Sequence, residues 1–151
     1  MTVEVEIETR IDQQPTAVFA ALIDVERYPA WLIASGIVRV ERLDPGAMAV
    51  GSRLRIAQTV AGRSTVLDGS VTACTPDRAF GLKGKDKDGV TIEIDAAITP
   101  DGGTSRLRWS LRLKLPLRFR VFESMVAPQA RHAAALDLEA FKRRLESGAG
   151  G

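Results

Sequence analysis

The chain is poor in the residue types that build disulfides and transition-metal sites. It has one cysteine, Cys74, and one histidine, His132, among 151 residues. A single cysteine cannot form an internal disulfide, and these two residues do not supply the ligand set of a zinc site. The sequence also lacks a glycine-rich phosphate loop and a nucleophile triad. We therefore expect no structural disulfide, no metal and no cofactor.

Long apolar runs and a strong net charge are absent as well. No apolar stretch is long enough to cross a bilayer, and the opening MTVEVEIETR alternates acidic and apolar residues, unlike a signal peptide. The formal net charge is only +2, so the composition does not indicate a nucleic-acid partner. The expectation is a cytoplasmic protein without a membrane span.

The length and the apolar content fit one globular unit. With 45% hydrophobic residues, a chain of this size can form a single core. We predict one domain over residues 1–147. The glycine-rich end, residues 148–151, is predicted to be a flexible tail.

Alternation of apolar and polar residues is the main pattern in the chain. Val3, Val5 and Ile7 alternate with glutamates, and the same spacing recurs between turn sequences such as Asp88-Gly89. This predicts seven strands, at 2–10, 37–43, 52–60, 63–75, 78–84, 89–99 and 104–115. From the second strand onward the connections are too short for crossover helices, so the sheet is predicted to be an antiparallel meander.

Charge suggests how the ends of this sheet meet. The polar face of the last strand carries four cations, Arg106, Arg108, Arg112 and Lys114. Acidic residues occupy the same face of the first strand and of strand 89–99. Opposite charges across paired strands contribute about 0.2–1 kcal/mol each. We therefore predict that the first strand pairs with the last.

Two short helices and one long helix complete the predicted elements. Pro15 suits the first position of a helix, and Asp24 can cap a second one that ends near Pro29. The long helix is predicted from about 117 to 147, with Pro128 inside it. Its two apolar stripes are out of phase, and a kink at Pro128 would bring both onto one surface.

The order of these elements and the local sequence resemble a known superfamily. IDQQPTAVFAALIDVERYPAWL contains an apolar helix, Asp24, a Tyr28-Pro29 pair and Trp31, and PGAMAVGSRLR and DLEAFKRRLE follow later. Together they resemble the START-like, Bet v 1-like (SRPBCC) superfamily, in particular its polyketide cyclase/dehydrase and lipid-transport branch. The resemblance implies an α+β helix-grip fold, in which a curved seven-stranded antiparallel sheet wraps around a long C-terminal helix.

The resemblance also implies an apolar cavity between the sheet and that helix, and a hydrophobic small-molecule ligand such as a lipid, a quinone-like ring or a polyketide. Trp109 is the strand residue most expected to contact it, because small residues such as Ala133 and Ala134 lie opposite. The expected ligand-binding residues are Tyr28, Trp31, Leu54, Ile56, Gln58, Leu67, Phe80, Ile92, Ile94, Trp109, Leu111, Phe122, Met125, Val126, Gln129 and Ala133. Some of the apolar residues must instead form ordinary core.

The sequence leaves three functions open. The first is binding, and possible transport, of the hydrophobic molecule. The second is a cofactor-free polyketide cyclase, aromatase or dehydratase, for which the candidate polar residues are Tyr28, Gln58, Asp68 and His132. The alternation favours Asp68 pointing to water, and His132 has no obvious carboxylate beside it. The third is protein-partner binding through the loop around Met48, which could also form a flap over the cavity or simply pack against the protein.

Overall fold

The computed structural model describes residues 2–148 and contains seven strands with helices before and after them. The strands are β1 (Thr2–Ile11), β2 (Ile37–Arg42), β3 (Arg53–Val60), β4 (Arg63–Thr75), β5 (Ala79–Lys85), β6 (Thr91–Asp101) and β7 (Thr104–Lys114). The helices are α1 (Pro15–Ile23), the 3-10 helices η1 (Val25–Ala30) and η2 (Leu117–Phe122), and α2 (Glu123–Glu146). Residues 149–151 of the predicted tail lie outside the described residues.

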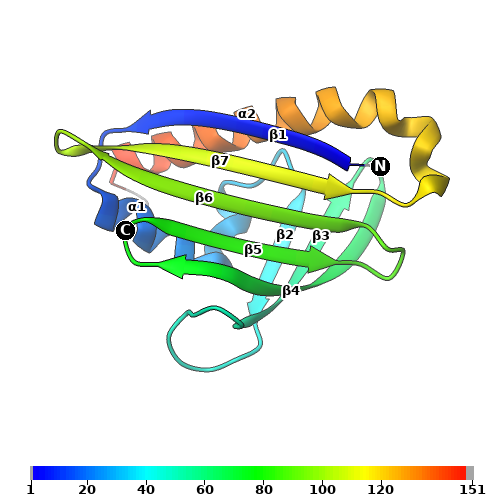
Figure 1. Cartoon of the computed structure of the whole chain (residues 1–151), viewed down its shortest axis with the longest axis horizontal. Helices are drawn as coiled ribbons and strands as arrows, with labels where there is room; N and C mark the ends of the chain where they lie inside the picture. Colours follow the sequence, from blue (N-terminus) through cyan, green and yellow to red (C-terminus); the bar gives the residue numbers. More distant parts are fainter. Residues whose placement is uncertain (1, 149–151) are drawn as a thin grey trace.

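The strands form one antiparallel sheet in the order β1-β7-β6-β5-β4-β3-β2. The sheet curves strongly, and α2 runs along its concave side while α1 and η1 close one end (Figure 1). This is the α+β helix-grip arrangement that the sequence predicted. The strand boundaries also agree within two residues, because alternation and turn residues are local signals.

The first strand pairs with the last, as predicted, and opposite charges face one another along this pair. β1 pairs with β7 in a register that places Glu4 opposite Arg112. The carboxylates of Glu4, Glu6 and Glu8 lie 3.0–3.3 Å from the guanidinium groups of Arg112, Arg108 and Arg106. Arg112 and Lys114 also lie near Glu93 on β6, at 3.8 and 3.9 Å.

The packed core lies under α1, η1 and the C-terminal half of α2. Leu138, Phe141 and Leu145 of α2 are buried there against residues such as Leu22 and Leu107. A smaller cluster joins α2 to β1, where Ala134 packs beside Val3 and Val5, with Val126 and Ala130 partly buried around them. The N-terminal half of α2 therefore packs against β1, an edge strand of the sheet.

Two helix predictions were wrong in detail. Asp24 makes no capping hydrogen bond, and its carboxylate instead lies 3.1 Å from Nε of Arg27. The predicted helix over 117–147 is divided into η2 and α2, since the chain leaves Pro116 as a 3-10 turn, a common start for an α-helix. Pro128 lies inside α2, which is assigned as one helix from residue 123 to residue 146.

Candidate functional site

The helix-grip arrangement leaves a cavity of about 370 Å³ beside the N-terminal half of α2. Its floor consists of Ile92 and Ile94 from β6 and Trp109, Leu111 and Leu113 from β7. One wall is α2 and the residue before it, and the other is the segment from Leu32 to Ile37 together with the hairpin that joins β3 and β4. The wall residues are Leu32, Ala34, Ser35, Ile37, Gln58, Val60, Ala61, Phe122, Met125, Val126, Gln129, Ala130, Ala133 and Ala134.

Side-chain size along α2 explains why the cavity is at this end. The middle of the helix presents only methyl groups to the sheet, from Ala130, Ala133 and Ala134. Further along, Phe141 and Leu145 are large enough to reach the sheet and are buried in the core. Because protein interiors otherwise pack densely, a run of alanines opposite a curved sheet leaves unfilled space.

An aromatic cluster separates the cavity from the core. The ring centroids of Trp31 and Trp109 are 5.6 Å apart, those of Trp31 and Tyr28 are 5.1 Å apart, and those of Trp31 and Phe141 are 4.4 Å apart. Of these four rings, only Trp109 lines the cavity. Two of these contacts, Trp31 with Tyr28 and Trp31 with Trp109, are edge-to-face and the third is tilted. Aromatic contacts of this kind favour a fixed ring geometry, so this end of the cavity has a rigid wall.

Buried polar contacts hold the opposite wall in place. Both carboxylate oxygens of Asp137 accept hydrogen bonds from the loop after η1, at 2.8 Å from the Ala34 nitrogen and 2.9 Å from the Ser35 nitrogen. Nε2 of Gln58 donates to the Ser35 carbonyl at 2.9 Å. Desolvation raises the pKa of Asp137, and the hydrogen bonds from Ser35 and Ala34 oppose this rise.

Few groups along the cavity can interact strongly with a polar ligand. None of the lining residues within the described chain ionises, and the side-chain hydrogen-bonding groups are those of Gln58, Ser35, Gln129 and Trp109. The amide oxygen of Gln58 has no hydrogen-bond partner within residues 2–148. No group of three or more His, Cys, Asp or Glu residues in this part of the chain could hold a metal ion. The site is therefore apolar, with isolated neutral polar groups.

The cavity opens to solvent between α2 and the β3–β4 hairpin. Val60, Phe122, Met125 and Gln129 all line it, and all four are exposed. A ligand could therefore enter past these side chains without displacing the core.

A charged cluster lies next to this opening and joins η2 to the hairpin. Arg63 bridges the carboxylates of Asp86, at 3.1 Å, and Asp88. Phe119 of η2 lies under the guanidinium groups of Arg63 and Arg118, with ring distances of 5.7 and 5.1 Å. We call Arg63, Asp86, Asp88, Arg118 and Phe119 the mouth cluster. Burial of the Asp86 carboxylate opposes its ionisation, but hydrogen bonds from Val90, Arg63 and Asp88 lower its pKa overall.

The structure gathers most of the expected ligand-binding residues around the cavity. The lining set includes Gln58, Ile92, Ile94, Trp109, Leu111, Phe122, Met125, Val126, Gln129 and Ala133. The other six, Tyr28, Trp31, Leu54, Ile56, Leu67 and Phe80, do not line it and are buried in the main core. They lie where α1, η1 and the large residues of α2 fill the space, and alternation alone could not show which half of the sheet those elements cover.

The candidate catalytic residues are dispersed. Only Gln58 borders the cavity. The Tyr28 hydroxyl is buried and donates to the Leu22 carbonyl, and burial raises the pKa of this phenol strongly, with the nearby Asp24 charge adding to the rise. Asp68 is exposed on the outer face of the sheet, and His132 is exposed on α2 outside the lining set.

Several lining residues were not expected from the sequence. These are Leu32, Ala34, Ser35, Ile37, Val60, Ala61, Leu113 and Ala130. Leu113 could have been found, since it continues the alternation of Trp109 and Leu111. The segment from Leu32 to Ala34 has no periodic pattern, and tertiary contacts place it at the cavity, among them burial of Leu32 in the core and the hydrogen bond from Ala34 to Asp137.

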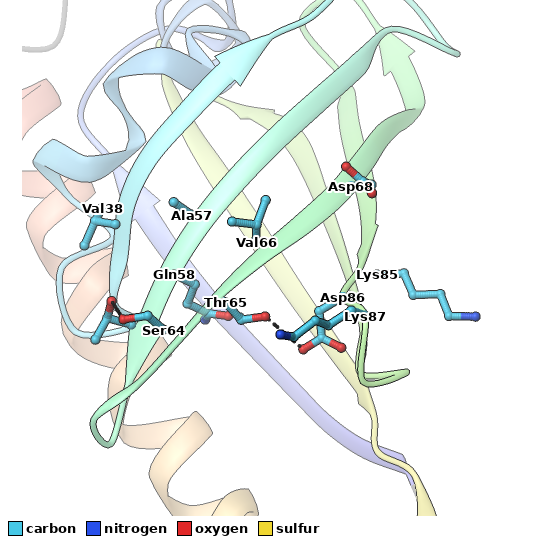
Figure 2. A pocket seen from close by; sticks show the side chains of 11 residues that line it. Val38, Ala57, Gln58, Ser64, Thr65, Val66, Asp68, Lys85, Asp86 and Lys87 are labelled. Atoms are coloured by element: carbon cyan, nitrogen blue, oxygen red, sulfur yellow. Dashed lines mark hydrogen bonds between the residues drawn. The ribbon is translucent and has the colours of Figure 1, made fainter.

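A second hollow lies on the outer face of the sheet and is larger, at about 710 Å³. Figure 2 shows its lining, which crosses from Val38 on β2 through Ala57 and Val66 to the charged side chains of Asp68 and Lys85. Val38 and Val66 are exposed, so an apolar guest here would keep much of its surface in water. The smaller cavity under α2 is therefore the better candidate site.

The loop around Met48 does not cover the cavity. Met48 packs partly buried against the main core, its carbonyl accepts a contact from Cys74 Sγ at 3.5 Å, and the loop contributes no lining residue. The flap interpretation was therefore wrong, because the loop joins the ends of β2 and β3 that are remote from the opening. Val50 is exposed, and a protein partner for this loop stays a prediction.

Comparison with known proteins identifies the family. The family model described as polyketide cyclase/dehydrase and lipid transport matches residues 2–146. The chain belongs to this family. No curated protein matches it significantly in sequence. Within residues 2–148, this member of the polyketide cyclase/dehydrase and lipid-transport family has no helix that is long and apolar enough to cross a bilayer.

Solved structures share the family fold at low sequence identity. A protein from Thermus thermophilus is 16% identical with a TM-score of 0.78, covering 96% of this chain and 98% of that one. A START superfamily protein from Mycobacterium smegmatis is 18% identical (TM-score 0.69; coverage 97% and 96%). Zhui aromatase/cyclase from a Streptomyces species is 16% identical (TM-score 0.69; coverage 100% of both chains). At these identities the likeness supports the fold alone.

Proposed function

We propose that this protein binds one small hydrophobic molecule in the cavity beside α2, and carries or protects it. The observation that carries the proposal is the cavity itself, which has an apolar floor, a rigid aromatic end and an opening to solvent. Its volume of about 370 Å³ falls in the lower part of the range for small-molecule sites.

The polar groups narrow the ligand class. Since none of the described lining residues is ionised, a charged guest would lose hydration without gaining an opposite charge. The free amide oxygen of Gln58 can accept a hydrogen bond. We therefore expect a neutral, largely apolar ring compound or short lipid with one or two polar groups, such as a hydroxyl.

A fluorescent probe and a pair of alanine variants test this proposal. N-phenyl-1-naphthylamine is neutral, apolar and brighter out of water, and it carries one N–H donor. We expect saturable binding to the wild-type protein. Ala133→Phe should abolish binding by filling the cavity, while Ala135→Phe, at an exposed position on the same helix, should leave it intact. Equal binding by both variants would contradict the proposed site.

A cofactor-free cyclase or dehydratase activity is the second candidate. The family description includes such enzymes, and the fold is shared with an aromatase/cyclase. Proton transfer needs a group with a suitable pKa near the substrate, however, and the lining residues of the described chain offer none. Incubation with a poly-β-ketone substrate, followed by mass spectrometry for loss of water, tests this candidate. Turnover that Gln58→Leu abolishes would favour it over simple binding.

A further inference from the structure

Apolar side chains stand exposed at one corner of the molecule, on η2 and the start of α2. Leu117 is 75% exposed, Val121 79%, Phe122 51% and Met125 68%. We call these four residues the corner patch. In Figure 1 the segment forms the corner where the yellow chain turns into the orange start of α2, at the end remote from α1. Exposed apolar groups that gather in this way mark an interaction surface.

The patch spans two helical segments. Leu117, Val121 and Phe122 lie on η2 and Met125 lies on the first turn of α2, and all four side chains are exposed. Phe119 points the other way, into the mouth cluster between Arg63 and Arg118. The corner therefore presents aliphatic groups outward and is anchored by its inward side.

Three cationic residues accompany these apolar groups in the sequence. From residue 114 to residue 122 the chain carries Lys114, Arg118 and Arg120 and no acidic residue. Two of the cations have nearby acids: Lys114 lies 3.9 Å from Glu93, and Arg118 lies 4.0 Å from Asp88. Glu123 follows directly in the sequence. A segment with apolar residues outward and cations alongside matches the chemistry of an anionic lipid surface.

The patch is continuous with the opening of the cavity. Phe122 and Met125 belong to both, since they line the cavity and are exposed. We propose that the corner patch docks reversibly on an anionic lipid bilayer, which places the cavity opening at the membrane surface. The proposal of docking is based on the corner patch and the nearby cations. The further idea, that docking serves to load or release an apolar guest, rests on the proposed function.

Vesicle co-sedimentation tests the docking. The wild-type protein should sediment with vesicles of phosphatidylcholine and phosphatidylglycerol, and less with pure phosphatidylcholine or at high salt. Leu117→Asp and Val121→Asp should each weaken this partition by about tenfold or more, which corresponds to the burial of one aliphatic side chain. Arg120→Gln should weaken it by about fivefold. Neither Leu117 nor Val121 lines the cavity, so these variants should still bind N-phenyl-1-naphthylamine in vesicle-free solution.

Val50→Asp is the matched control, because Val50 is 66% exposed in the loop at the other end of β2 and β3. It should sediment like the wild type. Three results would overturn the proposal: no sedimentation of the wild type, equal binding to neutral and anionic vesicles, or the same loss in Val50→Asp. A self-association that Val121→Asp removes, without any vesicle binding, would assign the patch to a second copy instead. Failure of probe binding with intact vesicle binding would contradict only the proposed function.

Discussion

Asp137 is a buried carboxylate on α2, and it binds two backbone nitrogens in one wall of the cavity. The wall segment from Leu32 to Ile37 has little regular structure, and these hydrogen bonds and the one from Gln58 help to position it, together with backbone hydrogen bonds such as the one from the Thr59 nitrogen to the Gly36 carbonyl. A carboxylate 103 residues away from Ala34 in the sequence thus contributes to the shape of the site. Its role could not be predicted from the sequence, because residues 137–140, DLEA, look like an ordinary part of an amphipathic helix.

Removing this carboxylate should destabilise the protein and loosen the wall. Asp137→Ala leaves two partly buried N–H groups without acceptors, and we expect the free energy of unfolding to fall by about 1–3 kcal/mol. Chemical denaturation measures the change. Glu139→Ala, at an exposed position on the same helix, should have little effect, and a similar loss there would contradict the assignment.

The raised pKa of Asp137 adds a separate, pH-dependent contribution to stability, and its sign is known. Since the folded-state pKa is raised above 3.8, the folded protein holds this proton more tightly than the unfolded chain. The stabilisation that comes from this tighter proton binding is therefore fully present below pH 3.8 and is lost as the pH rises through the folded-state value, whereas the carboxylate still accepts its hydrogen bonds from Ala34 and Ser35. The difference in unfolding free energy between the wild type and Asp137→Asn should fall with pH over that window. A difference that does not change with pH would contradict the raised pKa.

At the scale of elements, the mouth cluster ties η2 to the β3–β4 hairpin and to the β5–β6 turn. Arg63 of the hairpin reaches two carboxylates of the β5–β6 turn and stacks over Phe119. The lowered pKa of Asp86 means that its stabilising contribution is present above pH 3.8 and is lost as the pH falls through the folded-state value. One side of the cavity opening is thus tied to a charge cluster.

Removing the Arg63 charge should free η2. In Arg63→Met the side chain keeps much of its length, but Asp86 loses its cation. We expect amide hydrogen exchange in residues 117–122 to accelerate by about tenfold and the free energy of unfolding to fall by about 1–3 kcal/mol. Arg55→Met, at an exposed position of β3, serves as the control. Unchanged exchange in η2 would show that other contacts hold it.

Elements were the level at which the sequence was most informative. Alternation defined the strands, and the acidic and basic faces predicted that β1 pairs with β7. The sequence could not predict in the same way which apolar residues of the strands belong to the core and which line the cavity. It depends on which half of α2 carries large side chains, on where η1 places Trp31, and on the path of α2 over the sheet.

For the molecule as a whole, the cavity is a region where side chains do not fill the interior and where a guest molecule can bind. The lining side chains of Ile94, Leu111 and Ala133 lack the neighbours that buried residues usually have. Any molecule that binds only the folded state stabilises it, and a site present only in the folded protein is the clearest case.

Binding of the probe should therefore raise the free energy of unfolding, which thermal unfolding can measure. At an N-phenyl-1-naphthylamine concentration of about 100 times its dissociation constant, the free energy of unfolding should rise by about 2.7 kcal/mol. Ala133→Phe should show no rise, and without probe it should be at least as stable as Ala135→Phe. A probe that shifts the unfolding of both variants equally would be binding elsewhere.

The aromatic boundary of the cavity has an optical consequence. Trp31 and Trp109 are the chain's only tryptophans, and one is sealed in the core while the other forms the inner wall of the site. A guest changes the polarity around Trp109, whereas Trp31, whose ring centroid lies 5.6 Å away, does not line the site. The tryptophan fluorescence of the protein should therefore change when the cavity is occupied, so binding can be followed without a label.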